Sequence, residues 1–144
     1  MTIQADTPSA PANSPPAWPW WLLRAVFTLQ AVDAFLQPVF EGRFLSGDFP
    51  MLAAHRTNAS VVGVLAFVGV LVAILAWRIG RAPGTTAMVS AGLTTAVVLQ
   101  VFLGYSRNLG VHIPLGVLIV GLSGVLAWWS WTHGPARLTA RDES

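Results

Sequence analysis

The sequence predicts an all-α integral membrane protein, an antiparallel bundle of four transmembrane helices. Hydrophobic residues make up 54% of the 144 residues and charged residues only 10%, whereas soluble domains carry about 25% charged residues. Four apolar stretches are each long enough to cross a bilayer, which takes about 20 residues. The last two links between them are short, and short links join antiparallel neighbours.

The four predicted spans follow one another along most of the chain. They cover residues 19–40, 52–77, 85–105 and 111–131. The links between them read EGRFLSGDFP, RIGRAPG and SRNLG, in which glycine, proline and polar residues favour turns. We therefore expect one transmembrane domain over residues 18–133.

Both ends of the chain are predicted to be cytoplasmic tails. Residues 1–17 are rich in Pro, Ala, Ser and Thr, a composition typical of a disordered segment, and residues 134–144 form a second tail. No basic residue precedes the first apolar stretch, so the charged start of a signal peptide is missing and we expect the first helix to be retained.

The tryptophans predict the orientation. With four spans, all seven fall at one membrane face, where aromatic residues form interfacial belts. The arginines that flank the spans give a weaker bias to the same face, four against three. We expect a multi-pass protein of a bacterial plasma membrane with the tryptophans inside. They are Trp18, Trp20, Trp21, Trp77, Trp128, Trp129 and Trp131.

Composition argues against several classes of function. The sequence has no cysteine, which excludes disulfides, thiolate metal sites and iron–sulfur clusters. The formal charge of +2 is too small and too scattered for nucleic-acid binding. No nucleophile–base pair, phosphate loop or metal triad is visible, so an independent enzyme is the least supported function.

Polar side chains inside the predicted spans gather at one depth. The first and third spans run outward and the second and fourth run inward, which places these residues in the outer half of the bundle, with Gln30 at its border. Polar residues in a membrane are functional candidates by default, because burying them in lipid is costly. The group comprises Gln30, Asp33, Gln37, Glu41, His55, Asn58, Gln100 and His112.

Two histidines in this zone could act together. His55 lies 22 residues before Trp77 (77 − 55), and His112 lies 19 residues before Trp131 (131 − 112). At about 1.5 Å per residue, their heights above the inner belt differ by only about 4–5 Å. Two imidazoles at one depth on parallel helices can clamp a planar cofactor. The alternative is that each is an ordinary polar residue at the membrane interface.

Small residues follow both histidines on the same helix faces. Ala59 and Gly116 lie four residues after the two histidines, and Gly63 continues the face of the second span. Such positions leave room for a porphyrin edge against the helix backbone. Pro114 either opens the fourth helix near its first turn or bends it.

A pair of imidazoles above an apolar floor fits b-type haem better than zinc, which usually takes a third or fourth ligand. Haem propionates need cationic partners, and Arg56 and Arg107 lie at the outer rim. Gln37, Asp33 and Gln100 would border the same site. Asp33 is either a structural hydrogen-bond partner or a proton relay or quinone contact.

Two segments resemble the haem A synthase family. AHRTNASVVGVLAFVGVLVAI and LQVFLGYSRNLGVHIPLGVLIVG are similar to one four-helix half of those proteins, over roughly residues 50–125. That family places a histidine at the outer end of the second and fourth helices of each half. The resemblance therefore implies that His55 and His112 are axial haem ligands.

One position departs from the catalytic half of that family. The catalytic half carries a glutamate three residues before its first histidine, where this chain has Leu52. The resemblance is therefore closer to the half that holds haem b, and it puts haem A synthesis in doubt. The chain also resembles small four-span membrane proteins of high-GC bacteria.

The sequence thus predicts a membrane-bound b-type cytochrome-like protein that holds one bis-histidine haem near the outer leaflet for electron transfer. Its partners would be the lipid bilayer and a quinone or a respiratory-type membrane complex, in a homo- or hetero-oligomer. The alternative is a cofactor-free accessory subunit of a larger membrane complex. A small transporter is a weaker alternative, because the apolar inner half interrupts any continuous path.

Overall fold

The structure, a computed structural model, describes residues 15–134. Four long helices account for nearly all of them and confirm the predicted all-α four-helix bundle. The predicted tails, residues 1–17 and 134–144, lie outside the described residues apart from residues 15–17 and 134. The helices are α1 (Trp18–Leu45), α2 (Met51–Arg78), α3 (Gly84–Tyr105) and α4 (Leu109–Thr132).

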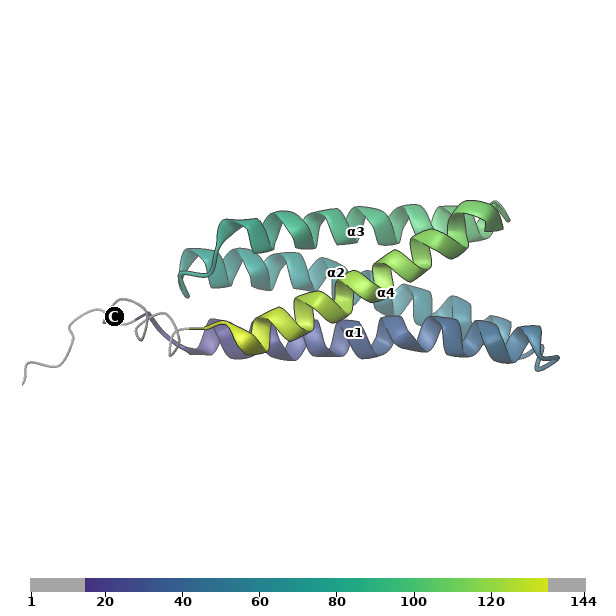
Figure 1. Ribbon diagram of the computed structural model, residues 1–144, viewed down its shortest axis with the longest axis horizontal. Helices are drawn as coiled ribbons and strands as arrows, with labels where there is room; N and C mark the ends of the chain where they lie inside the picture. Colours follow the sequence, from purple (N-terminus) through teal and green to yellow (C-terminus); the bar gives the residue numbers. More distant parts are fainter. Residues whose placement is uncertain (1–14, 135–144) are drawn as a thin grey trace, which may run out of the picture.

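The helices form a closed ring in which each runs antiparallel to the next (Figure 1). Neighbours along the chain pack together, α4 closes the ring against α1, and the diagonal pairs α1–α3 and α2–α4 have no backbone contact. α4 crosses the bundle obliquely, from beside α3 at its start to beside α1 at its end (Figure 1). We call the end that contains His55 and His112 the histidine end, and the end that contains Trp20 and Trp129 the tryptophan end.

The helix boundaries follow from proline and glycine. Pro19 lies in the first turn of α1, and Pro50 and Pro83 cap the starts of α2 and α3, positions where the missing proline N–H costs nothing. The predicted first link begins at Glu41, but α1 continues to Leu45. It ends before Gly47, whose φ of +98° is accessible to glycine at little cost.

Two prolines lie inside helices near the histidine end. α4 already begins at Leu109, so Pro114 is an interior residue rather than the start of the helix. Pro38 has the same place in α1. Each proline removes the backbone hydrogen bond to the carbonyl four residues earlier, which leaves the histidine end with backbone acceptors that the helices themselves do not use.

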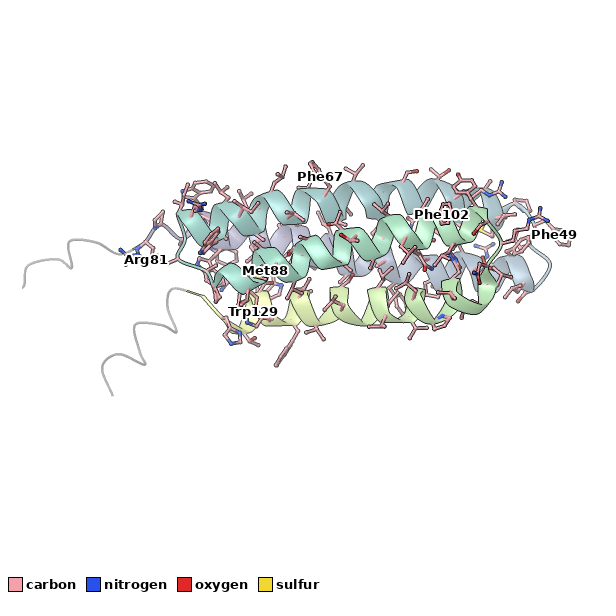
Figure 2. All side chains as sticks on the ribbon, turned by 90° about the horizontal axis from the view of Figure 1, so that it is seen from above. Phe49, Phe67, Arg81, Met88, Phe102 and Trp129 are labelled. Carbon is pink, nitrogen blue, oxygen red and sulfur yellow. The ribbon has the colours of Figure 1, made fainter. Side chains whose placement is uncertain are left out.

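Three of the four predicted spans are confirmed: α2, α3 and α4 are long and apolar enough to cross a membrane. The chain is thus a multi-pass membrane protein by length and composition. α1 is as long as α2 but carries more polar residues. Its polar face turns inward and its apolar face outward, since Gln30 is 2% exposed while Leu29 and Phe35 are 57% and 60% exposed. Apolar side chains project from all four helices (Figure 2).

The apolar core fills the tryptophan half of the bundle. Bulky side chains of α1 pack there against the small alanines of α2, which let the two helices approach closely. The polar zone occupies the histidine half, as the sequence predicts. The core residues include Trp20, Leu23, Phe27, Ala66, Ala73, Ala76, Leu93 and Leu126.

Trp20 departs from the predicted aromatic belt. It is 1% exposed, and its Nε1–H donates a hydrogen bond of 2.8 Å to the carbonyl of Gly80. Its ring also lies 5.7 Å from that of Trp129. A Cβ on Gly80 would come within 2.9 Å of the Ala76 carbonyl. Trp20 therefore joins α1 to the end of α2 as a core residue, unlike the exposed tryptophans Trp18, Trp21, Trp77, Trp128 and Trp131 at the same end.

Arg24 has a structural role that the sequence does not reveal. Its Nε donates to the Ser130 carbonyl at 3.0 Å, and a terminal nitrogen donates to the His133 carbonyl at 3.2 Å. Its guanidinium also lies over the rings of Trp21 and Trp131. Arg24 thus caps the last carbonyls of α4, where a helix favours positive charge.

Arg24→Met is therefore expected to lower the free energy of unfolding by about 2–3 kcal/mol, because charge-assisted hydrogen bonds are lost and carbonyls are left unpaired. Arg78→Met is the matched control. Arg78 only stacks over Trp77 at the surface, and its loss should cost less than about 1 kcal/mol. Unfolding in mixed detergent micelles measures both variants. Equal losses of unfolding free energy in the two variants would contradict the capping role of Arg24.

Candidate functional site

The candidate site is the pair His55 and His112 at the histidine end. His55 lies in the second turn of α2 and His112 in the first turn of α4. These helices form a diagonal pair without backbone contact, yet the two ring centres are 6.3 Å apart, with ring planes inclined by 58°. The side chains therefore meet across the interior of the bundle. The matching depth predicted from the sequence is confirmed.

Each imidazole is held by a backbone carbonyl of the preceding helix. The Nδ1 of His55 lies 3.2 Å from the carbonyl oxygen of Gln37, and the Nδ1 of His112 lies 2.9 Å from that of Gln100. A carbonyl oxygen only accepts hydrogen bonds. Nδ1 therefore carries the proton in both rings and donates it, which leaves the lone pair of Nε2 on each ring free to bind a ligand.

The two halves of the site are built alike. In the hairpin α1–α2, Leu36-Gln37 precedes the histidine, and in the hairpin α3–α4, Leu99-Gln100 does so. Each glutamine supplies its carbonyl to the histidine of the following helix. The two halves do not read as an internal repeat in the sequence, because the shared motif is only a few residues long and a proline follows Gln37 but not Gln100. The correspondence becomes visible only when the carbonyl–imidazole pairs are compared.

The polar neighbours of His55 come from α1 and α2. Asn58 donates a hydrogen bond of 3.0 Å to the carbonyl of Asp33. A carboxylate oxygen of Glu41 lies 3.9 Å from the Nδ1 of His55, beyond hydrogen-bond distance. The structure thus brings Asp33, Gln37, His55 and Asn58 close together between α1 and α2, and the hydrogen bonds of His55 and Asn58 go to backbone carbonyls.

The small residues near the site differ in what surrounds them. A Cβ on Gly116 would lie 2.9 Å from the side-chain amide of Gln100, so this amide occupies space that the sequence assigns to a cofactor edge. A Cβ on Gly63 would meet nothing within 4 Å, and Ala59 is half-buried. A Cβ on Gly104 would lie 3.0 Å from Cε1 of His112. Gly104 therefore lets α3 approach the imidazole closely.

Two predicted rim residues, Arg56 and Arg107, are exposed at the histidine end. Neither forms an ion pair within residues 15–134, whereas Arg43 pairs with Asp48 in the first loop. Arg107 adopts a φ of +58° at the turn between α3 and α4. Both arginines are thus available to an anionic group at this surface.

The histidines are a pair and not part of a larger cluster. Across the described part of the chain, no three His, Cys, Asp or Glu side chains are placed to hold a metal ion. Several buried polar atoms nearby have no hydrogen-bond partner within residues 15–134. They belong to Gln30, Asp33, Gln37, Gln100 and Ser123.

Comparison with protein-family models, with curated proteins and with solved structures gives no match for this chain.

Proposed function

We propose that this chain is a membrane-bound b-type cytochrome-like protein in which His55 and His112 are the axial ligands of one haem. The observation that carries the proposal is the meeting of the two imidazoles across the bundle, with ring centres 6.3 Å apart and Nε2 free on both. When bound, the haem iron would supply one-electron transfer. The protein would supply the ligands and their orientation.

The ring separation supports a shared metal ion. A histidine nitrogen binds a metal at about 2 Å, so two imidazoles would be able to share one ion only if their rings lie within several ångströms of each other. The observed separation is 6.3 Å. Because the described residues offer no third side-chain ligand, a haem iron, which brings its own four nitrogens, suits this pair better than zinc.

The carbonyls of Gln37 and Gln100 would hold the two metal-binding histidines in place. A ligating histidine usually donates its other N–H to a carbonyl or carboxylate, and this bond fixes the ring and makes Nε2 a better donor to the metal. Both histidines already make this bond. The ligands are therefore held in place before any cofactor arrives, which lowers the entropy lost on binding.

We further infer that α1 is a fourth span and that the tryptophan end faces the cytoplasm. The outward face of α1 is apolar over its whole middle, with Leu29, Val32 and Phe35 all exposed, and lipid is the solvent that such a face suits. Four spans bring the described ends of the chain to one side. The histidine site then lies near the outer leaflet, where Arg56 and Arg107 can pair with haem propionates.

The first test of this proposal is the haem content of the purified protein. Produced in a haem-replete bacterial host and purified in detergent, it should yield one b-type haem per chain by the pyridine haemochrome assay. Quinols or a respiratory-type complex are then the electron donors to examine. A preparation that remains colourless after addition of haemin would contradict the proposal.

Gly104→Ala should weaken haem binding by roughly tenfold, because the new methyl group would press on the imidazole of His112 and shift its Nε2. Gly92→Ala is the control on the same helix, since a Cβ there meets nothing within 4 Å. Titration of haem-free protein with haemin, followed by absorbance, measures both. Equal affinities would show that close approach of α3 does not position His112.

A cofactor-free accessory subunit is the second candidate, and one observation favours it. The same two histidine–carbonyl hydrogen bonds join α1 to α2 and α3 to α4, as a purely structural histidine does between membrane helices. In that case His55→Asn and His112→Asn should destabilise the bundle of a protein that never binds haem. Absence of haem together with stable copurification in a larger membrane complex would identify this function.

A further inference from the structure

We propose that the unpartnered polar side chains below the histidines line a narrow, water-filled channel that opens at the histidine end and is closed at the tryptophan end. The channel would bring water and protons to the middle of the bundle. The inference rests on these side chains alone and does not require that a haem is bound. Its lining groups come from Gln30, Asp33, Gln37, Gln100 and Ser123.

The floor of the channel is formed by Gln30 and Ser123. They are 2% and 0% exposed, and none of their side-chain polar atoms has a hydrogen-bond partner within residues 15–134. A buried group left in this state costs about 1–3 kcal/mol, more in lipid, where no solvent water compensates. Two such residues therefore indicate a binding site for a polar ligand.

Gln30 and Ser123 lie on adjacent helices, both on the histidine side of the contacts that join α1 to α4. Arg24 of α1 contacts the Ser130 carbonyl of α4, the ring of Trp20 lies 5.7 Å from that of Trp129, and the two helices run antiparallel. Gln30 is six residues beyond the first contact (30 − 24) and ten beyond the second (30 − 20), whereas Ser123 is seven (130 − 123) and six (129 − 123). At about 1.5 Å per residue, the two levels therefore differ by about 1.5–6 Å.

The other lining groups connect this floor to the histidine end. Asp33 and Gln37 follow Gln30 on the same face of α1, and Gln37 lies about 10 Å above Gln30 along the helix. Gln37 and Gln100 contact the two histidines through their carbonyls, while their side-chain oxygens are buried and unpartnered among the described residues. The polar atoms therefore continue from one level to the next.

The chemistry of the lining identifies water as the ligand. Carboxamides offer both donors and acceptors, a hydroxyl offers both, and a carboxylate offers acceptors. A ligand that satisfies all of them must donate and accept at short intervals in a narrow space, as buried water does with about three hydrogen bonds each.

Below the floor the core is mainly apolar. Phe27, Leu93 and Leu126 are buried there on the tryptophan side, and the buried hydroxyls of Ser90 and Ser130 are bonded to carbonyls of their own helices. Water and protons would therefore enter and leave only at the histidine end. Asp33 is the carboxyl group that faces this path from α1.

The absence of cysteine from the sequence makes a direct test simple. In vesicles, Ser123→Cys should react with a small water-soluble methanethiosulfonate applied to the histidine side. Ser90→Cys is the matched control, because Ser90 is equally buried but its hydroxyl is bonded to the Thr86 carbonyl. We expect a rate at least about tenfold higher at position 123, since a thiol in apolar surroundings rarely ionises to the reactive thiolate.

Two further variants keep the test decisive. Gln30→Met in the Ser123→Cys protein should slow the reaction by filling the floor with an apolar side chain. If Ser123→Cys does not fold, the reaction rates of Gln30→Cys and Ala73→Cys are compared instead. Both positions are deeply buried. Equal reaction rates for the two cysteines of whichever pair folds would contradict the channel. The haem content of each variant is measured separately, so a failure of the channel and a failure of the cytochrome proposal give different results.

Discussion

Alanine in place of either His55 or His112 is expected to abolish haem retention through purification. His55 and His112 are the only histidines at this end of the bundle. The free Nε2 of each ring is the atom that can bind iron. Loss of one ligand leaves the other histidine to hold the cofactor alone. The pyridine haemochrome assay, normalised to protein, measures the loss.

His133→Ala is the matched control for this pair of variants. His133 lies at the tryptophan end, exposed and stacked on Trp129 at 5.1 Å, and its removal should leave the haem content unchanged. Helical circular dichroism shows whether the alanine variants still fold. A folded His55→Ala or His112→Ala protein with full haem content would remove that residue from the ligand set.

Trp20→Ala is expected to cause the largest loss of stability, about 3–5 kcal/mol. The substitution empties a site between α1, α2 and α4 and removes the hydrogen bond from the indole N–H to Gly80. Trp20→Phe separates these effects. It keeps most of the packing but leaves the Gly80 carbonyl unpaired, for a cost of about 1–3 kcal/mol.

Trp128→Ala provides the comparison for Trp20→Ala. Trp128 is 66% exposed on α4, and its replacement should change the free energy of unfolding by no more than about 0.5 kcal/mol. Unfolding in mixed micelles, followed by tryptophan fluorescence or circular dichroism, measures all three variants. Similar losses for positions 20 and 128 would show that Trp20 is an interfacial residue after all.

The number and order of the helices could be predicted from sequence because each is a long apolar stretch between turn-forming links. The helix boundaries are harder to predict. Glu41, Gly42 and Arg43 have the composition of a loop, yet α1 includes them, because a helix at a membrane surface can place polar side chains in water without losing its backbone hydrogen bonds. By hydropathy alone, only α2, α3 and α4 are apolar enough to be spans. α1 is less hydrophobic because of the polar residues on its inward face.

The pairing of His55 and His112 could also be predicted, since counting residues from the tryptophan end gives depth along straight helices. The partners of their Nδ1 atoms could not, because the carbonyls of Gln37 and Gln100 belong to the backbone and no side-chain pattern marks them. The sequence predicts that a cofactor edge fills the space beside Gly116, whereas in the structure the Gln100 amide lies there. Which side chain fills a gap depends on helix rotation, which a single sequence does not fix.

If both imidazoles bind one haem iron, the electron paramagnetic resonance spectrum of the oxidised, haem-loaded protein will show it. Two histidine ligands predict a low-spin ferric signal that is lost in both His55→Ala and His112→Ala. A high-spin signal from the unmodified protein would mean that at least one histidine does not bind the iron. That result would contradict the bis-histidine site.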